Sequence, residues 1–426
     1  MDQSKAQNAQ TPEAWDTRYE YKIISLMFVG YGLVSLDRFI LFPLFPTIAA
    51  DLGLDYGELG LISAILALTW GMSSFVAGNL ADRIGSKTVM VTSAIIFSAM
   101  VAFTGLAGGF ISLMIIRALM GAAEGAFIPP SISETIKNSK PSRIGLNFGI
   151  VQTSQPLFGR ALAPVLAIGL LSILPGWQWV FGVVAIPGFI FVYFLVTVFK
   201  PERTPSMAGG GAAAPQLQKP SIGEVFKYRN VLAGAIALTA LLTTLFVQTT
   251  FAPSFLIDYI KVSQTVMSFL IASIGVGGFV GMLLFPAMSD KFGRKPVICG
   301  AMTFQFFGIP YLMSANTESS VFLLALAFFC NALSISGTVA TLIGPLINTS
   351  VPKRIATSAT GTVVGIAEIL GGAGGPAFAG FASNAYGIEI MPTLMLGSAI
   401  VAILVIVFGV EEPKPLDVEA PAQPPS

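Results

Sequence analysis

Charged residues inside apolar segments are the feature of this sequence that points most clearly to chemistry. Residues 110–134 form an apolar stretch long enough to span a bilayer, yet Arg117 and Glu124 lie in its interior. Seven residues make two helical turns, so both side chains fall on one face of the expected helix, with Gly121 between them. A charge at bilayer depth is unfavourable by about 3 kcal/mol. Such residues are therefore expected to face each other or a polar cavity.

Three arginines and three acids share this property of lying inside apolar segments. They are Asp37, Arg38, Arg117, Glu124, Arg160 and Glu368. The planar guanidinium of arginine fits a carboxylate or phosphate with two hydrogen bonds and stays charged at any relevant pH. When all six groups are ionised their charges cancel. If one acid takes up a proton, an arginine is released to bind an anion, and proton uptake becomes coupled to anion affinity.

Composition places these residues in a polytopic membrane protein. The chain has 426 residues, of which 54% are hydrophobic and 11% charged, whereas about 25% are charged in soluble domains. A net charge of +1 gives no support for nucleic-acid binding. The two cysteines lie in apolar runs and form neither a disulfide framework nor a metal cluster. Since there is no histidine, proton-coupled chemistry would depend on carboxylates.

Twelve apolar segments of spanning length can be counted, six before and six after a Pro/Gly/Ala-rich linker. We expect an N-terminal tail at 1–21, a six-helix bundle at 22–199, the linker at 200–228, a second bundle at 229–410 and a disordered tail at 411–426. Lys and Arg gather in the tails, the linker and alternate turns, while the turns on the other side hold only Lys261. By the positive-inside rule both termini are then cytoplasmic. The polar N-terminus does not resemble a signal peptide.

A short motif repeats between the two halves. Residues 78–87 read GNLADRIGSK and residues 289–295 read SDKFGRK. Asp82 and Asp290 are 208 residues apart, and so are Gly85 and Gly293. The two bundles are therefore expected to be parallel repeats that start on the same side of the membrane.

With this repeat, the chain resembles the major facilitator superfamily over nearly its whole length. The matching motif residues are Gly78, Asp82, Arg83 and Gly85 in the first half and Asp290, Gly293 and Arg294 in the second. The resemblance implies an all-α membrane protein in which two six-helix bundles rock around a central site. The aspartates would favour the start of the following helix, and the basic residues would hold the cytoplasmic side closed. Alternatively, the basic residues serve only as a topology signal.

The charged residues also resemble those of a narrower group, the anion:cation symporter family. Asp37 and Arg38 in the first span, with Arg117, Glu124 and Pro129 in the fourth, carry this resemblance. The family includes sugar-acid transporters of the galactonate type and vesicular organic-anion carriers. The resemblance implies that Arg38 contacts the substrate carboxylate, that Asp37 and Glu124 serve proton coupling, and that Arg117 is the partner of Glu124.

Three further residues extend or depart from that pattern. Gln155 stands nine residues before Pro164, as a substrate-binding glutamine does in sugar-acid members. Arg160 departs from the pattern, and is either a second anion clamp or a partner for Glu124. Glu368 departs too, and is a second proton site, an acceptor for substrate or compensation for Arg160. Amides such as Gln152, Gln248 and Asn331 can equally be hydrogen-bonded glue between helices.

The expected function is proton-coupled uptake of a small organic anion across a bacterial inner membrane. Substrate-binding residues would be Arg38, Arg117, Gln155, Arg160 and Glu368, with Asp37 and Glu124 as proton carriers. The protein would act as a monomer in the lipid bilayer, with no cofactor or metal and the proton gradient as driving force. No enzyme motif is present. Two alternatives share the fold: a proton-coupled exporter of drugs or cations, which three buried arginines disfavour, and a sensor that binds without transporting. Several of the charged residues also have a purely structural alternative. Arg117 and Glu124 could form a static pair, Asp37 could only neutralise an arginine, and Arg160 could line an outer vestibule. The identity of the anion is left open.

Overall fold

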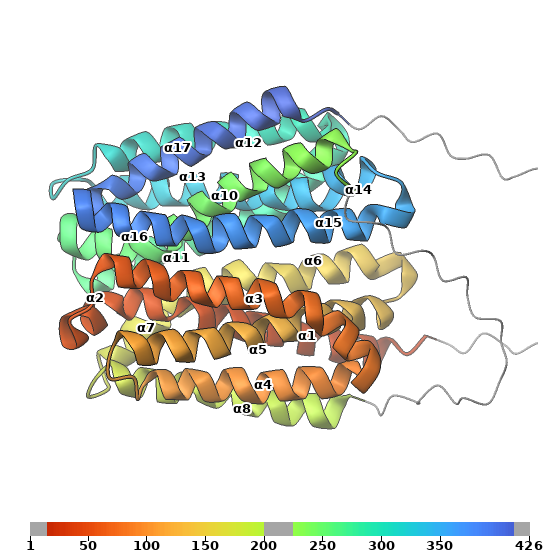
Figure 1. Ribbon diagram of the computed structural model, residues 1–426, viewed down its shortest axis with the longest axis horizontal. Coiled ribbons are helices and arrows are strands. Elements are labelled where there is room, and N and C mark those ends of the chain that lie inside the picture. Colours follow the sequence, from red (N-terminus) through yellow and green to blue (C-terminus); the bar gives the residue numbers. More distant parts are fainter. Residues whose placement is uncertain (1–14, 200–224, 413–426) are drawn as a thin grey trace, which may run out of the picture.

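The computed structural model describes residues 15–199 and 225–412, which form long helices joined by short turns (Figure 1). Twelve helical segments within these ranges are long and apolar enough to cross a membrane. The prediction of twelve spans in an all-α protein is thereby confirmed. Of the linker predicted at 200–228, residues 200–224 lie outside the described residues, and so does the C-terminal tail from residue 413.

The first bundle contains six spans. They are α1 (Thr17–Phe39) with α2 (Leu41–Leu52); α3 (Tyr56–Ile84); α4 (Ser86–Thr104); α5 (Phe110–Lys137); α6 (Ile144–Ser154) with η2 (Gln155–Leu162) and α7 (Ala163–Leu171); and α8 (Trp177–Val198). The 3₁₀ turn η1 (Pro141–Arg143) precedes α6.

The second bundle repeats this plan. Its spans are α10 (Arg229–Ser254) with η3 (Phe255–Tyr259); α11 (Gln264–Phe292); α12 (Arg294–Met313); α13 (Val321–Thr341) with η4 (Leu342–Leu346) and α14 (Ile347–Thr349); α15 (Lys353–Ala367) with η5 (Glu368–Ala373) and α16 (Gly374–Tyr386); and α17 (Met391–Leu404) with η7 (Val405–Gly409). The 3₁₀ turn η6 (Ile388–Ile390) precedes α17.

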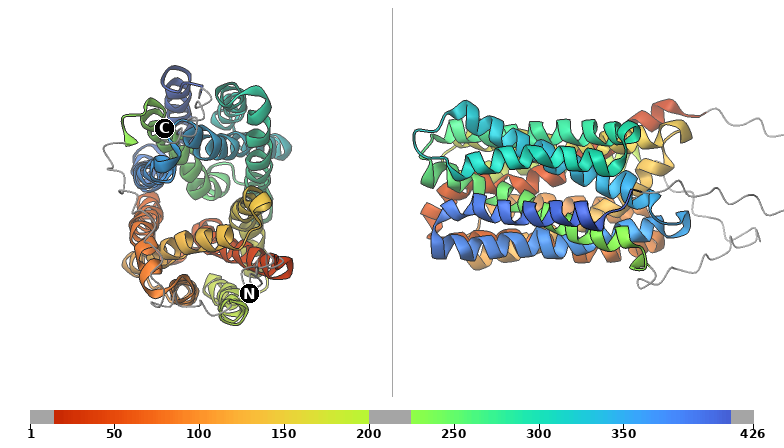
Figure 2. Two further views of the ribbon diagram at one scale, coloured as in Figure 1. Left: turned by 90° about the vertical axis from the view of Figure 1, so that its right-hand side faces the viewer. Right: turned by 90° about the horizontal axis from the view of Figure 1, so that it is seen from above.

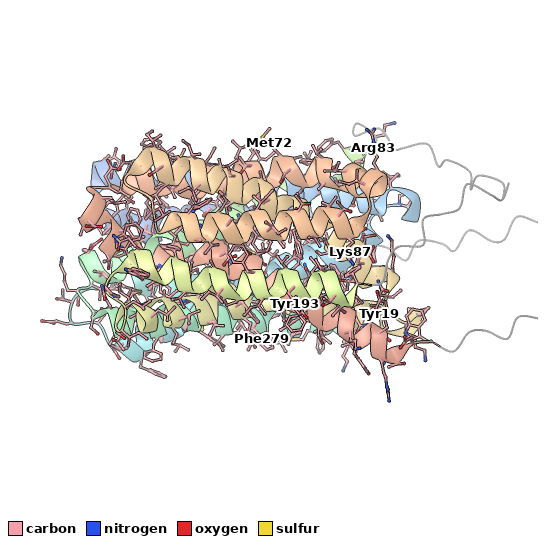
Figure 3. All side chains as sticks on the ribbon, turned by 90° about the horizontal axis from the view of Figure 1, so that it is seen from below. Tyr19, Met72, Arg83, Lys87, Tyr193 and Phe279 are labelled. Atoms are coloured by element: carbon pink, nitrogen blue, oxygen red, sulfur yellow. The ribbon has the colours of Figure 1, made fainter. Side chains whose placement is uncertain are left out.

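The two bundles lie side by side with their helices roughly along one axis (Figures 1 and 2). The described chain begins and ends at the same end of the molecule, which we call the terminal end. The other end, where α2 meets α3 and α16 approaches α17, is called the opposite end. Figure 3 shows side chains over the whole surface, with Arg83 and Lys87 at the terminal end.

Helix α1 corrects one predicted boundary, because it begins at Thr17, inside the segment expected to be a tail. The Asp16 side chain accepts a hydrogen bond from the Tyr19 N–H and starts the helix. Glu20 is buried and accepts hydrogen bonds from the Trp15 indole, the Arg143 guanidinium and the Asn147 amide. A count of apolar residues overlooks this turn, since polar contacts bury it.

The repeated motif has the same geometry in both halves. Gly85 has φ 90° and ψ 139°, and Gly293 has φ 88° and ψ 155°, a region that only glycine adopts readily. The Lys87 ammonium donates to the carbonyls of Val196 and Phe199, at the end of α8. Lys295, 208 residues later, donates to the carbonyls of Val407 and Val410 at the end of the twelfth span. Each lysine thus caps the last span of its own bundle.

Among the other motif residues, Arg294 and Asp290 contact each other within their own bundle. Arg294 pairs with Asp290 at 3.3 Å, one helical turn away. Arg83 is exposed at the terminal end, and Gly78 is partly buried in α3. The Asp82 side chain lies outside what the structure describes. Closure of this end by the basic residues therefore stays a prediction about another conformation.

Hydrogen bonds join the bundles only at mid-depth and at the opposite end, as far as the described residues show. At the opposite end Tyr56 donates its hydroxyl to Asp258 at 2.9 Å and its N–H to Asn384, and Gln264 donates to Thr47. At mid-depth Ser63 and Thr250 share a hydrogen bond, and Arg38 contacts Glu368.

Candidate functional site

The six charged residues that were predicted from the sequence come together between α1, α5, η2 and η5. Five are almost completely buried: Asp37, Arg38, Arg117, Glu124 and Arg160 are each 5% exposed or less. The side chain of Glu368 is 13% exposed. All but Glu368 belong to the first bundle, so the site lies where the charged interior of that bundle meets η5 of the second bundle.

Breaks in helical geometry position several of these side chains. The first span is interrupted at Ile40, between α1 and α2, and Arg38 lies in the last turn before the break. Gln155 and Arg160 lie in the π-helical segment η2, which contains Pro156, and Glu368 opens the π-helical segment η5. A proline removes one backbone N–H, and single π turns inside α-helices occur frequently at functional sites.

Close packing of α5 on α3 fixes Arg117 and Glu124. A Cβ atom on Gly121 would collide with the backbone oxygen of Leu66, and one on Gly125 with that of Trp70. Both glycines therefore let the two backbones approach closely. Beside this contact, Arg117 reaches the backbone of α1.

Arg38 is enclosed by groups from both bundles. Its Nη2 atom lies 3.5 Å from Oε2 of Glu368, an ion pair across the interface. The guanidinium carbon also lies 4.6 Å from the ring centre of Phe246, 5.6 Å from Trp70 and 5.7 Å from Phe39. Charge-assisted hydrogen bonds are usually about 2.7–2.9 Å long. The Arg38–Glu368 contact is longer, so a ligand can compete for either partner.

Arg117 binds the backbone of the first span and forms no ion pair within the described chain. Its Nη1 atom donates to the carbonyl oxygens of Asp37 at 3.3 Å and Arg38 at 3.4 Å, beside the sulfur of Met120. These carbonyls lie at the C-terminal end of α1, where a positive charge is favourable. The side chain thereby supports the turn that carries Asp37 and Arg38.

Glu124 is fully buried, and neither of its carboxylate oxygens has a hydrogen-bond partner in the described part of the chain. It lies near enough to Asp37 and Arg117 for the three charges to interact through space. No hydrogen bond or ion pair joins Arg117 to Glu124 in the described chain, and both Arg38 and Arg117 lie near enough to act on Glu124 through space. Asp37 faces this group, while its neighbour Arg38 faces the second bundle.

Arg160 has no acid beside it, in contrast to both partnerships considered from the sequence. No hydrogen bond or ion pair joins it to any described residue, and its Nε atom is buried without a partner. Arg38 lies near enough for its positive charge to repel that of Arg160. Glu368 compensates Arg38 instead. Gln155 is partly buried and makes no hydrogen bond to the described residues.

Three aromatic residues near the site were missed from the sequence. Trp70 and Phe246 face the Arg38 guanidinium, and the buried Tyr31 lies near Gln152 and Glu368. The sequence contains 33 phenylalanines, 9 tyrosines and 4 tryptophans, so residue type alone could not single them out. Gln248 and Asn331 proved to be hydrogen-bonded to each other within the second bundle.

The space between Arg38 and Arg117 is almost filled in this conformation. A void of about 10 Å³ remains, lined by these two arginines, Ser63 and Phe246. That volume is roughly enough for one water molecule. A ligand larger than water therefore requires the bundles or side chains to move apart here.

Two repeated bundles of six spans, with a charged site at their interface, define the class of membrane transporters built from paired helical repeats. The chain belongs to the Major Facilitator Superfamily, whose model matches residues 27–367 and 235–425. Its relatives are transporters, and this protein is likewise a transporter and not an enzyme.

Two relatives and one solved structure illustrate the similarity. The hexuronate transporter of Bacillus subtilis (strain 168) is 28% identical over 324 residues, which cover 72% of this chain and 76% of that protein. The D-galactonate transporter of Escherichia coli O6:H1 is 26% identical over 423 residues, covering 91% and 94%. The crystal structure of a bacterial homolog to the human lysosomal transporter Spinster, inward-facing and unoccupied, matches with a TM-score of 0.69 at 18% identity, covering 92% and 95%. This last match concerns the fold alone.

Proposed function

We propose that the protein is a proton-coupled symporter that takes up a small organic anion of the sugar-acid type by alternating access. The observation that carries this proposal is the set of three buried arginines, of which Arg160 has no acid beside it in the described chain. Burying a cation without a counter-charge is strongly unfavourable. An anionic substrate supplies that charge, and a cationic drug would be repelled. The names of the hexuronate and D-galactonate transporters support the choice of a carboxylate.

Glu124 and Asp37 are the proposed proton carriers. A buried carboxylate without hydrogen-bond donors is unfavourable, so Glu124 holds a proton in this conformation. With Glu124 neutral, the six groups carry a net charge of +1, which complements one carboxylate. Release of that proton restores neutrality and weakens anion binding. Proton and anion affinities are linked reciprocally in this way.

The conformation fits one end state of the transport cycle. Lys and Arg residues cluster in the turns and tails at the terminal end, which we therefore assign to the cytoplasm. The hydrogen bonds of Tyr56 with Asp258 and of Gln264 with Thr47 then close the outer side. The structure is accordingly assigned to the inward-facing state of a protein in a bacterial inner membrane.

A ligand screen on the purified full-length protein tests the proposal. Ligands that bind the folded state raise its melting temperature by mass action. We expect stabilisation by one class of carboxylates, such as hexuronates or aldonates, stronger at pH 5.5 than at pH 8. Lipophilic cations serve as the comparison set. Stabilisation by cations and by no anion would contradict the proposal and favour an exporter.

A further inference from the structure

Of the three arginines in the site, Arg160 has the fewest partners for its guanidinium. Arg38 is held by Glu368 and three rings, and Arg117 by two backbone carbonyls. Arg160 has neither kind of partner in the described chain, is 3% exposed and is repelled by Arg38. A charge in that position is stabilised only by something that arrives from outside the protein.

A serine and a glycine of the second bundle face the same point as Arg160. A Cβ atom built on Gly278 of α11 would collide with Oγ of Ser336 at 2.9 Å and would stand 3.3 Å from Cβ of Pro156 and 3.4 Å from Nη2 of Arg160. The glycine therefore lets α11 pack closely on η2. The Ser336 hydroxyl is buried and, among the described residues, has no hydrogen-bond partner. An unpaired hydroxyl and an unpaired guanidinium from opposite bundles thus lie close to the same glycine.

We propose that Arg160 and Ser336 anchor the carboxylate of the substrate, which enters between them as η2 and α11 move apart beside Gly278. This inference rests on the proposed function and moves the anion anchor away from Arg38, where the family resemblance would put it. The guanidinium and the hydroxyl both donate to the carboxylate oxygens. Because Arg160 belongs to the first bundle and Ser336 to the second, the bound carboxylate joins the two bundles.

The same placement orients the rest of the substrate. Glu368 accepts hydrogen bonds from substrate hydroxyls, while Trp70 and Phe246 give an apolar surface beside it. Arg38 then neutralises Glu368. The substrate class that satisfies both ends is a polyhydroxy monocarboxylate, with its acid group at Arg160 and its hydroxyl groups toward Glu368.

The test compares binding of D-galacturonate with binding of its uncharged amide, D-galacturonamide, to the purified full-length protein. We expect the wild type to prefer the acid. Arg160→Gln should weaken acid binding by about 100-fold or more and remove the preference, because a buried charge pair is broken. Arg160→Lys should recover part of the preference for the acid. Ser336→Ala should weaken acid binding by roughly 10-fold, as loss of a hydrogen bond to a charged group does.

Ser334→Ala is the matched control. Ser334 is also buried on α13 without a partner in the described chain, but two residues on a helix point about 200° apart. We expect this variant to bind the acid as the wild type does. Arg38→Gln should weaken the acid and the amide together and keep the preference between them.

Two outcomes would overturn the inference in different ways. If Arg38→Gln removes the preference for the acid while Arg160→Gln keeps it, the anchor is Arg38, and anion transport itself still stands. If the wild type binds neither galacturonate nor galactonate nor glucuronate, the proposed function fails together with the inference. Melting temperatures of the unliganded variants show whether each one is folded, and Arg160→Lys carries the test if Arg160→Gln is not.

Discussion

Single residues of the site fall into three environments. Arg38 is shared between Glu368 and three aromatic rings, Arg117 supports the backbone at the end of α1, and Arg160 has no partner within the described residues. The first arrangement bridges the bundles, the second holds one bundle together, and the third is the anion anchor that we propose. Three residues of one type thus serve three purposes, which their common burial alone does not reveal.

The ion pair between Arg38 and Glu368 should show strong coupling in a double-mutant cycle. Arg38→Gln leaves Glu368 without its cation, and Glu368→Gln leaves Arg38 without its anion, whereas the double variant leaves neither. We expect the double variant to lose less free energy of unfolding than the sum of the losses in the two single variants, with a difference of about 1–3 kcal/mol. Unfolding of the detergent-purified protein measures it.

The exposed pair Arg229 and Glu411 gives the control cycle. Their side chains are 59% and 64% exposed, so we expect a coupling below about 1 kcal/mol. Equal coupling energies for the two cycles would contradict the view that burial makes the Arg38–Glu368 pair important.

Glu124 should set the pH dependence of anion binding. In the wild type, a proton on Glu124 leaves net positive charge in the site, so anion affinity should rise as pH falls from 8 to 5.5. Glu124→Gln imitates the neutral acid at every pH. We expect this variant to bind the anion at pH 8 about as tightly as the wild type does at pH 5.5. Titrations at both pH values measure it, and an unchanged pH dependence in the variant would remove Glu124 from the coupling.

The sequence predicted which residues of the site are charged and buried, but not how they pair. The high free energy of a charge in a membrane marks Asp37, Arg117 and Glu124 without any structure. Arg38 and Glu368, however, are separated by 330 residues, and no local spacing relates them. Their contact depends on how two bundles dock. Arg160 was assigned an acid partner as one alternative, and the docking leaves it none within the described chain.

Individual elements combine regular helix with breaks, some of them at the charged site. The first span breaks at Ile40, and π turns occur at η2 and η5, but also at η3, η4 and η7 away from the charged site. Span count, repeat and glycine turns were readable from the sequence because hydropathy and the Gly–Asp spacing are local signals. The start of α1 was not, because the hydrogen bonds of Glu20 to Arg143 and Asn147 bury it. The π turns were not predicted either, since they depend on packing around Pro156 and Glu368.

Gly293 should tolerate no side chain. Its φ of 88° with ψ of 155° lies in a region that is essentially restricted to glycine, so Gly293→Ala should destabilise the protein by about 1–3 kcal/mol. Gly300→Ala, in the following helix α12 and with no atom near the added Cβ, should be neutral or stabilising. Melting temperatures of the two variants measure the difference. Equal stability of the two variants would show that the turn relaxes.

In the whole molecule, the two bundles contact each other at mid-depth and pack closely at the opposite end. A Cβ atom on Gly380 of α16 would lie 3.1 Å and 3.2 Å from the Cα atoms of Gly57 and Gly60 in α3. These glycines therefore let the two bundles close on each other at this end. On the proposed topology, this contact seals the site from the outside.

Gly380→Ala should favour the state that is open at the opposite end. The probe is Ser63→Cys at the bundle interface, in a background where Cys299 and Cys330 are alanine. We expect faster reaction with a membrane-impermeant thiol reagent from outside in Gly380→Ala than in the parent. Gly397→Ala, whose added Cβ meets open space, is the matched control and should not change the rate. No increase in Gly380→Ala would mean that the closed end adapts to the extra methyl group.

Transport in proteoliposomes tests the central claim, which is uptake of an organic anion driven by protons. Labelled D-galacturonate is offered with an imposed proton gradient, and its accumulation is followed with and without a protonophore. We expect accumulation that requires the gradient in the wild type. Asp37→Asn and Glu124→Gln should lose accumulation but retain exchange of internal for external substrate. Accumulation against the gradient of substrate by both variants would contradict the assignment of the proton carriers, and accumulation unaffected by the protonophore would contradict proton coupling itself.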